Sequence, residues 1–256
     1  MVNSQRSIVN RQWSIVINFT HVYEAYNFMQ GDEFKWVDCT QIEGTDCYCD
    51  QEAEQKLKEL MAEQPLETIH WIDSGDYHYV SKLWIDRIDK PFTLLVMDHH
   101  PDMQRPMFDK LLSCGSWVRA VLEENPWLQK VILIGVDDKL LSEVEGFAGK
   151  VEVVSESELN RKPIEAIIQG LHISLPVYVS IDKDVMTPNE CSTNWDQGSM
   201  SWQQLTALLD YLLKGEVLGI DICGEEPKIL TECVYCLDSN INADYNESLY
   251  NYIKGK

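Results

Sequence analysis

The sequence has no apolar run long enough to cross a bilayer, and it is poor in positive charge. Its 21 Lys and Arg residues are outnumbered by 42 Asp and Glu residues, so the formal net charge is −21 at pH 7. This balance argues against a nucleic-acid backbone or an anionic membrane as a partner, and the missing apolar run argues against a membrane span. We expect most of the excess acid to be solvated surface, but a cationic substrate or bound metal ions would also suit it.

The N-terminal segment also lacks the continuous apolar stretch of a secretory signal. We therefore expect a cytoplasmic protein whose eight cysteines are reduced thiols and not a disulfide framework. Cys233 and Cys236 have the C-x-x-C spacing of a zinc or redox pair. Because their only possible companions, Cys47 and Cys49, form a poor zinc knuckle, we expect thiols without a ligand at these positions.

No repeat, low-complexity tract or Pro/Gly-rich linker divides the chain. Its composition, 45% hydrophobic and 25% charged, is that of an ordinary globular protein. A length of 256 residues is enough to bury one large core. We therefore predict a single domain over residues 1–256.

Apolar runs of strand length recur along the chain, with amphipathic segments between them. The expected strands are 14–19, 34–39, 68–73, 93–97, 131–136, 151–154, 177–181 and 217–222. The segments with helical spacing are 50–61, 77–88, 108–122, 199–213 and 244–253, and Ser201 is a candidate N-cap. Most of the strand runs are continuous, which is typical of strands covered on both faces. The pattern predicts a three-layer α/β/α fold with a mostly parallel sheet of roughly eight strands.

Ligands of such sheets bind beyond the carboxyl ends of the strands, and three of these ends carry acids or histidines. The stretches are DSGDYH at 73–78, DHHPD at 98–102 and DKD at 182–184. In an extended chain Asp98, His100 and Asp102 share one face, while His99 points to the other. The same spacing points Asp182 and Asp184 in one direction.

Four carboxylates in one place would repel one another strongly unless a cation were present. We therefore predict a metal site, and a dinuclear one, because bridging carboxylates can serve two ions. Oxygen ligands with a few imidazoles favour Mn²⁺, with Zn²⁺, Fe²⁺ or Co²⁺ as alternatives. The candidate ligands are His78, Asp98, His100, Asp102, Asp182 and Asp184. We expect the remaining histidines, His21, His70 and His172, to be surface or satisfied core residues, and His99 to orient a ligand or simply to pack.

These motifs resemble those of the arginase/agmatinase ureohydrolase superfamily, whose fold also underlies the histone deacetylases. That family carries Gly-Gly-Asp-His, Asp-x-His-x-Asp and Ser-x-Asp-x-Asp-x-x-x-Pro elements, in this order, on three strand ends. The corresponding stretches are SGDYH at 74–78, DHHPD at 98–102 and SIDKDVMTP at 180–188. The first match is looser, because Tyr77 precedes the histidine. DICGEEP at 221–227 resembles the family's late Asp-Ile-Val-Glu-x-Asn-Pro strand. The chain thus resembles a short, divergent arginase-like protein.

The resemblance implies two Mn²⁺ ions per chain with a hydroxide between them, which would attack the planar carbon of a guanidinium or a related amidino or amide group. One ion would be held by His78, Asp98, Asp102 and Asp182, and the other by Asp98, His100, Asp182 and Asp184. Asp102 would also bond the hydroxide and pass its proton on. The expected enzyme is a hydrolase of C–N bonds other than peptide bonds.

Two positions depart from the family pattern. Trp117, in SCGSW at 113–117, takes the place of a family histidine, and Gly224 takes the place of the glutamate that pairs with the guanidinium. One-residue slippage would let Glu225 or Glu226 substitute, so both are candidate catalytic residues, with solvated loop acids as the alternative. We expect a cationic small-molecule or peptide substrate. The short loops would leave a more open pocket, which suits a larger substrate such as an arginine within a peptide.

Three other functions stay open from the sequence. Residues 94–100 resemble the strand-then-DHH element of the DHH phosphoesterases, but that family's N-terminal Asp pair and Gly-rich His element are absent from the sequence. A deacetylase-like amidohydrolase would use a single metal ion. A non-catalytic homologue would keep the metal ligands and have lost the family histidine. The sequence does not specify an oligomeric state.

Overall fold

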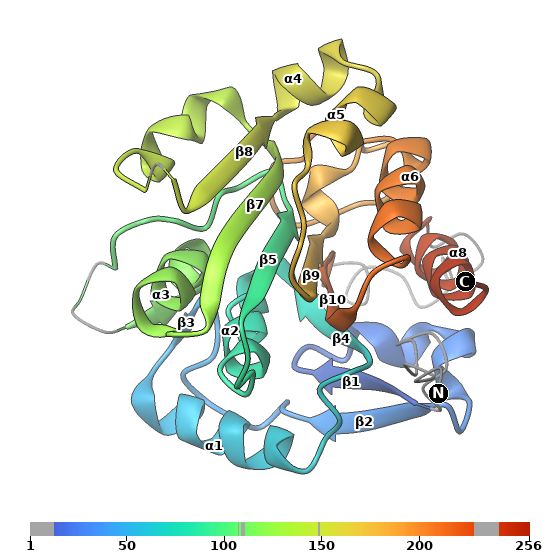
Figure 1. Ribbon diagram of the computed structural model, residues 1–256. Helices are drawn as coiled ribbons and strands as arrows, with labels where there is room; N and C mark the ends of the chain where they lie inside the picture. The colour runs from blue at the N-terminus through green and yellow to red at the C-terminus, as the bar shows by residue number, and fades with distance from the viewer. Residues whose placement is uncertain (1–12, 107, 109–110, 148, 228–240) are drawn as a thin grey trace, which may run out of the picture.

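The computed structural model describes residues 13–106, 108, 111–147, 149–227 and 241–256 (Figure 1). Eight strands form one sheet in which each neighbouring pair is parallel, in the order β2–β1–β4–β10–β9–β5–β7–β8. They are β1 (Ser14–Asn18), β2 (Phe34–Asp38), β4 (Ile69–Ser74), β5 (Phe92–Met97), β7 (Leu128–Val136), β8 (Val151–Ser155), β9 (Val177–Asp182) and β10 (Val217–Glu225). The prediction of a mostly parallel sheet of about eight strands is confirmed.

The strands form where the apolar runs are continuous. Each residue of β5 and of β9 is buried, because helices cover both faces of the sheet. Alternate side chains enter different layers: Val16 packs into one core, whereas Ile15 and Ile17 pack into the other. The apolar runs therefore predict these eight strands without information about their partners.

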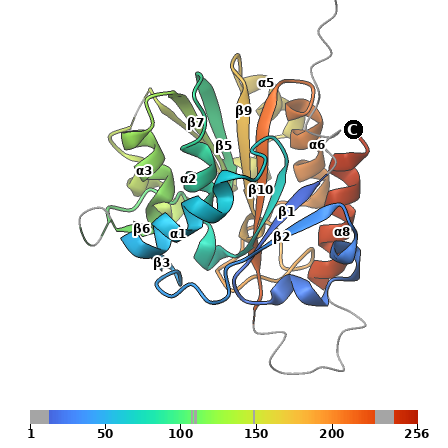
Figure 2. The ribbon, with the colours of Figure 1, turned by 90° about the horizontal axis from the view of Figure 1, so that it is seen from below.

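Helices cover the two faces in two groups, which Figure 2 shows on opposite sides of the sheet. One layer contains α1 (Gln51–Ala62), α2 (Val80–Ile85) and α3 (Trp117–Glu124). The other contains α4 (Glu156–Arg161), α5 (Ile164–Gly170), α6 (Trp202–Leu212) and α8 (Ile241–Lys254). The predicted helices α1, α6 and α8 lie close to their expected ranges, and Ser201 caps α6 with a capping box to Gln204.

The helix expected over 108–122 is wrong in its first half. β6 (Leu112–Ser113) pairs antiparallel with β3 (Tyr48–Cys49), and α3 begins only after the 3₁₀ turn η5 (Cys114–Ser116). Helical spacing could not reveal this pairing, because the partner strand lies far earlier in the chain. The helix expected over 77–88 is also shorter, since the turn η4 (Gly75–Tyr77) precedes α2.

The sheet order places the ends of β4, β10, β9 and β5 side by side. The loops that leave these ends therefore meet at one edge of the sheet. Further 3₁₀ turns are η2 (Val22–Ala25), η3 (Asn27–Gln30), η6 (Asp138–Val144) and η7 (Lys183–Val185). Within the described ranges, no helix has the length and apolar character to cross a membrane. Cys233 and Cys236 lie outside the described residues.

Candidate metal centre

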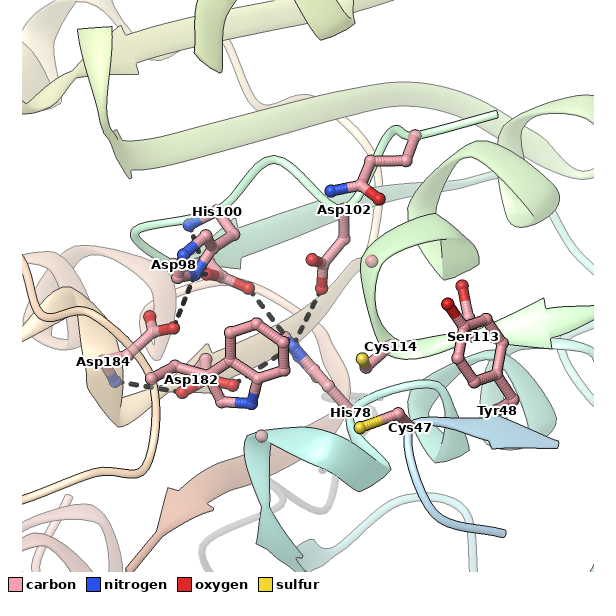
Figure 3. Close-up of a pocket in the computed structure, with 14 residues that line it drawn as sticks. Cys47, Tyr48, His78, Asp98, His100, Asp102, Ser113, Cys114, Asp182 and Asp184 are labelled. Atoms are coloured by element: carbon pink, nitrogen blue, oxygen red, sulfur yellow. Dashed lines mark hydrogen bonds and ion pairs between the residues drawn. The ribbon is translucent and has the colours of Figure 1, made fainter. Parts of the chain in front are cut away.

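Six side chains from three strand ends gather at the carboxyl edge of the sheet (Figure 3). They are the residues that the sequence singles out as candidate ligands: His78, Asp98, His100, Asp102, Asp182 and Asp184. The backbone turns sharply here, because Asp102 has a left-handed conformation with φ of +51°. Such strain in a residue other than glycine costs energy and is common at functional sites.

His78 faces three carboxylates, as the dashed lines in Figure 3 show. Its Nδ1 lies 3.2 Å from Asp98 Oδ2, 3.1 Å from Asp102 Oδ2 and 3.4 Å from Asp182 Oδ2. The other ring nitrogen, Nε2, is within 2.8 Å of the Ser180 hydroxyl. A partner on one nitrogen orients the ring and directs the other nitrogen to the acids.

His100 forms a second group with two acids. Its Nδ1 lies 2.8 Å from Asp184 Oδ2 and 3.7 Å from Asp98 Oδ1. The backbone N–H of His99 donates to Asp184 Oδ1 over 3.0 Å and so fixes that carboxylate. The two oxygens of Asp98 therefore face different imidazoles.

Asp182 contributes mainly to the group around His78. Its Oδ1 accepts a hydrogen bond from the backbone N–H of Asp184 over 2.9 Å, while Oδ2 points to His78. The resemblance assigned Asp182 to both ions. In the structure, Asp182 Oδ2, which does not take part in the backbone bond, lies against His78. Asp98 is the carboxylate that reaches both His78 and His100.

Burial of these acids has electrostatic consequences. It raises the pKa of each of the four Asp carboxyls, to about 6 for Asp182 and Asp184. Burial lowers the pKa of His100, but the hydrogen bond to Asp184 and the neighbouring carboxylates outweigh this and raise it to about 10. These carboxyls and His100 therefore hold their protons more strongly than usual, and a divalent ion would compete with those protons.

The donor atoms fit divalent metal ions. Asp98 Oδ2 is buried and makes no hydrogen bond within the described residues, although the His78 nitrogen is nearby. A buried carboxylate oxygen whose contact is this imidazole alone, without a well-formed hydrogen bond, is available to a metal ion that would satisfy it. Carboxylate oxygens combined with imidazole nitrogens suit Mn²⁺, Fe²⁺, Co²⁺ or Zn²⁺.

A cavity of about 200 Å³ opens above these six side chains. The other described residues that line it have uncharged side chains: Cys47, Tyr48, Gly75, Gln104, Ser113, Cys114, Gly115 and Trp195. The β3–β6 ladder, which the sequence did not predict, supplies two of them, Tyr48 and Ser113. A small flat group can therefore reach the candidate ligands from solvent.

Glu225 lies elsewhere. Its carboxylate is fully buried, is ion-paired with Lys183 and accepts a hydrogen bond from Asn246 over 2.6 Å. Lys183 begins the 3₁₀ turn η7, and its side chain points away from the cavity to Glu225 and Asn246. Glu226 is half-buried and does not line the cavity. In this structure neither glutamate faces the cavity, where the predicted catalytic role would require it to lie.

Gly224 has no room for a side chain. Its φ is +91°, and a Cβ atom there would lie 2.4 Å from Asp182 Oδ1 and 2.8 Å from the backbone nitrogen of Lys183. The glycine thus lets β10 approach the loop that carries two candidate ligands. A glutamate at this position, as in the family pattern, is incompatible with this backbone.

Trp117 is buried and donates its indole N–H to Asp102 Oδ2 over 2.6 Å. The residue is not part of the cavity wall, but it contacts a candidate ligand directly. Sequence reasoning identified the position and not the hydrogen bond. Ser180 and Trp195 were likewise missed as site residues, because their contacts come from other strand ends.

The other histidines have separate environments. His70 is buried, pairs with Asp221 over 2.8 Å and stacks on Trp84, as expected for a satisfied core residue. His21 and His172 are exposed. His99 is buried outside the cavity wall, with a ring nitrogen that has no hydrogen bond within the described residues.

Comparisons with known proteins agree with this architecture. The model of the arginase family matches residues 14–232. An uncharacterized protein of Thermotoga maritima is 32% identical over 157 residues, which are 61% of this chain and 58% of that protein; the match therefore spans less than two thirds of this relative. The arginase of Medicago truncatula has a TM-score of 0.68 at 19% identity, covering 94% of this chain and 85% of that one. For the agmatine ureohydrolase of Thermoplasma volcanium the values are 0.66 and 15%, with 99% and 92% covered.

Proposed function

Because this chain belongs to the arginase family, we propose that it is a metal-dependent hydrolase, with two Mn²⁺ ions, that cleaves a C–N bond of a guanidino or related amidino or amide group. Asp98 carries the proposal. Its Oδ2 lies 3.2 Å from His78 Nδ1, and its Oδ1 lies 3.7 Å from His100 Nδ1. A carboxylate shared between two imidazole groups has the arrangement of a ligand that bridges two ions.

The ions would be held by the six candidate ligands, with Asp98 common to both groups. When bound, two divalent ions lower the pKa of a water molecule and supply a nucleophile at neutral pH. The chain orients its ligands through outer partners: the Ser180 hydroxyl at His78 Nε2 and the His99 N–H at Asp184.

Asp102 is the side chain we propose for proton transfer. Its carboxylate is buried, which raises its pKa, and its Oδ2 lies 3.1 Å from His78 Nδ1. Trp117 can donate to this oxygen but cannot accept a proton. Proton transfer therefore depends on Asp102 and solvent, not on a histidine at position 117.

We propose a small molecule or a peptide side chain as the substrate, including arginine within a peptide. The cavity of about 200 Å³ suits a flat group of this size, and the net charge of −21 favours a cation. An arginase and an agmatine ureohydrolase share the fold. Both names point to guanidino substrates.

The first experiment compares the wild-type protein with Asp182→Ala and with a surface control, Asp210→Ala. Metal content per chain is measured by elemental analysis after loading with Mn²⁺. Urea and ammonia release is then measured from arginine, agmatine, guanidinobutyrate, formimino compounds and arginyl peptides. We expect the wild type and the control to bind two ions and to be active, and Asp182→Ala to lose metal binding and activity.

Other outcomes select other functions. One Zn²⁺ per chain would favour a deacetylase-like amidohydrolase. Mn²⁺ binding without release of urea or ammonia from any compound would favour a non-catalytic homologue. Hydrolysis of a simple phosphodiester would favour a phosphoesterase. Full activity in Asp182→Ala would contradict the site itself.

A further inference from the structure

Among the described residues, the cavity offers a cationic substrate no carboxylate besides those of the candidate ligands. The other described side chains that line it are uncharged. The position of the family glutamate is occupied by Gly224, where a Cβ would lie 2.4 Å from Asp182 Oδ1, and Glu225 is bound to Lys183 in the core. A guanidinium or amidinium must therefore be recognised in another way, because burying an unpaired cation is costly.

Trp195 is placed to do this. Its side chain lines the cavity and is 40% exposed. The indole lies over Gly75, where a Cβ would come within 2.7 Å of Trp195 Cδ1 and 3.3 Å of Asp182 Oδ2. The ring also meets that of His100 edge to face at 5.8 Å. The indole is thus directly beside two candidate ligands.

The loop that carries Trp195 is held in place. The indole N–H donates to Asp76 Oδ1 over 3.0 Å, and the neighbouring Asn194 amide donates to Asp76 Oδ2 over 2.8 Å. Gly198 N–H donates to Asp184 O over 2.6 Å, which ties the loop to the metal-ligand turn. The only polar atom of the Trp195 side chain is therefore already bonded, so this side chain can offer a ligand its aromatic ring but no hydrogen-bonding group.

We propose that Trp195 determines substrate specificity: the face of its indole binds the planar cationic group of the substrate, a guanidinium or amidinium, in place of a carboxylate. Cations bind the electron-rich face of tryptophan more strongly than that of other aromatic residues. Tyr48, 43% exposed on another part of the cavity wall, adds aromatic surface for the aliphatic stem of an arginine-like side chain. This inference rests on the proposed function.

The experiment uses Mn²⁺-loaded, full-length protein and two probes of equal length. Nα-acetyl-arginine amide carries a planar cation, and Nα-acetyl-citrulline amide carries a planar neutral group. Binding is measured by isothermal titration calorimetry in the wild type, Trp195→Leu and Trp195→Phe. The control is Trp127→Leu, which removes a tryptophan that is 41% exposed but not part of the cavity wall.

We expect the wild type and Trp127→Leu to bind the arginine probe more tightly than the citrulline probe. Trp195→Leu should weaken binding of the arginine probe about five- to thirtyfold, with little effect on the citrulline probe. Trp195→Phe should give an intermediate loss. Unchanged Mn²⁺ stoichiometry would show that each variant is folded.

Two results would overturn the proposal: equal binding of both probes by the wild type, or an undiminished preference in Trp195→Leu. The proposed function fails separately. If no guanidino, amidino or amide compound is hydrolysed but the preference still depends on Trp195, the binding inference stands and the catalytic proposal falls. If hydrolysis occurs while the preference for the arginine probe is independent of Trp195, the catalytic proposal stands and the binding inference falls.

Discussion

The indole N–H of Trp117 donates a hydrogen bond of 2.6 Å to Asp102 Oδ2, and both residues are buried. Asp102 has a left-handed backbone, with φ of +51°, and the same oxygen faces His78. Trp117 thus holds the strained candidate ligand Asp102 in place from outside the cavity. An indole can donate but not accept, so this contact holds Asp102 without carrying protons.

Replacing Trp117 by phenylalanine should weaken metal binding. The substitution leaves Asp102 Oδ2 without its donor, which costs about 1–3 kcal/mol, and loosens the ligand. We expect about a tenfold loss of Mn²⁺ affinity, in the range seen when an outer partner of a ligand is removed. The Mn²⁺ affinity is measured by isothermal titration calorimetry. The matched control is Trp71→Phe, because Trp71 is also buried but its N–H has no hydrogen bond within the described residues. Equal losses in the two variants would contradict the role of the hydrogen bond.

Gly224→Ala should displace Asp182. The new Cβ would lie 2.4 Å from Asp182 Oδ1, and the positive φ of +91° adds strain. We expect reduced Mn²⁺ stoichiometry or affinity, measured by elemental analysis and titration. Gly146→Ala separates the two effects, since Gly146 has φ of +94° but nothing within 4 Å of its Cβ position. Metal binding that is unchanged in Gly224→Ala would show that the close approach is not needed.

Breaking the buried pair of Lys183 and Glu225 should destabilise the fold. Removing one partner leaves an uncompensated buried charge, so Lys183→Met should lower the free energy of unfolding by about 3–5 kcal/mol. The double variant Lys183→Met/Glu225→Gln should lose less, because neither charge remains and the glutamine oxygen can still accept from Tyr26, Asn242 or Asn246. Chemical denaturation gives both values. The control, Lys56→Met, breaks an exposed pair with Glu52 and should cost less than about 1 kcal/mol. A loss in the double variant as large as in Lys183→Met would contradict the ion-pair explanation.

Mn²⁺ binding should strengthen as pH rises. In the folded, metal-free protein the pKa of His100 is raised to about 10, whereas an unfolded histidine has a pKa near 6.5. Binding of this proton therefore stabilises the folded state, and the stabilisation is fully present below about pH 6.5. This contribution is lost as pH rises from about 6.5 to about 10, over the range in which the proton leaves the folded protein. Mn²⁺ competes with that proton.

The measurement is the melting temperature with and without Mn²⁺ between pH 6 and pH 9. We expect the metal-free protein to lose stability over this range and the shift caused by Mn²⁺ to grow. In His100→Asn the pH dependence of the shift should be smaller. A shift that is constant with pH in the wild type would mean that no proton is displaced.

The amino-acid sequence by itself determined the strands and the kinds of ligand at their ends. Apolar runs such as that of β5 are local properties, and they specify the buried strands. The motif DHHPD likewise places Asp98, His100 and Asp102 directly after β5, although the chain there leaves the strand and turns at Asp102.

Only the tertiary structure decided which residues meet across the sheet. The partner of Lys183 is Glu225, the partner of Asp102 is Trp117, and Trp195 comes to His100 from a loop beyond β9. The motif makes Glu225 a candidate substrate ligand or a solvated loop acid, but the direction of β10 turns its side chain into the core. These contacts depend on strand order, on the twist and register of neighbouring strands and on the β3–β6 ladder. All of these join segments far apart in the chain, and no local pattern contains them.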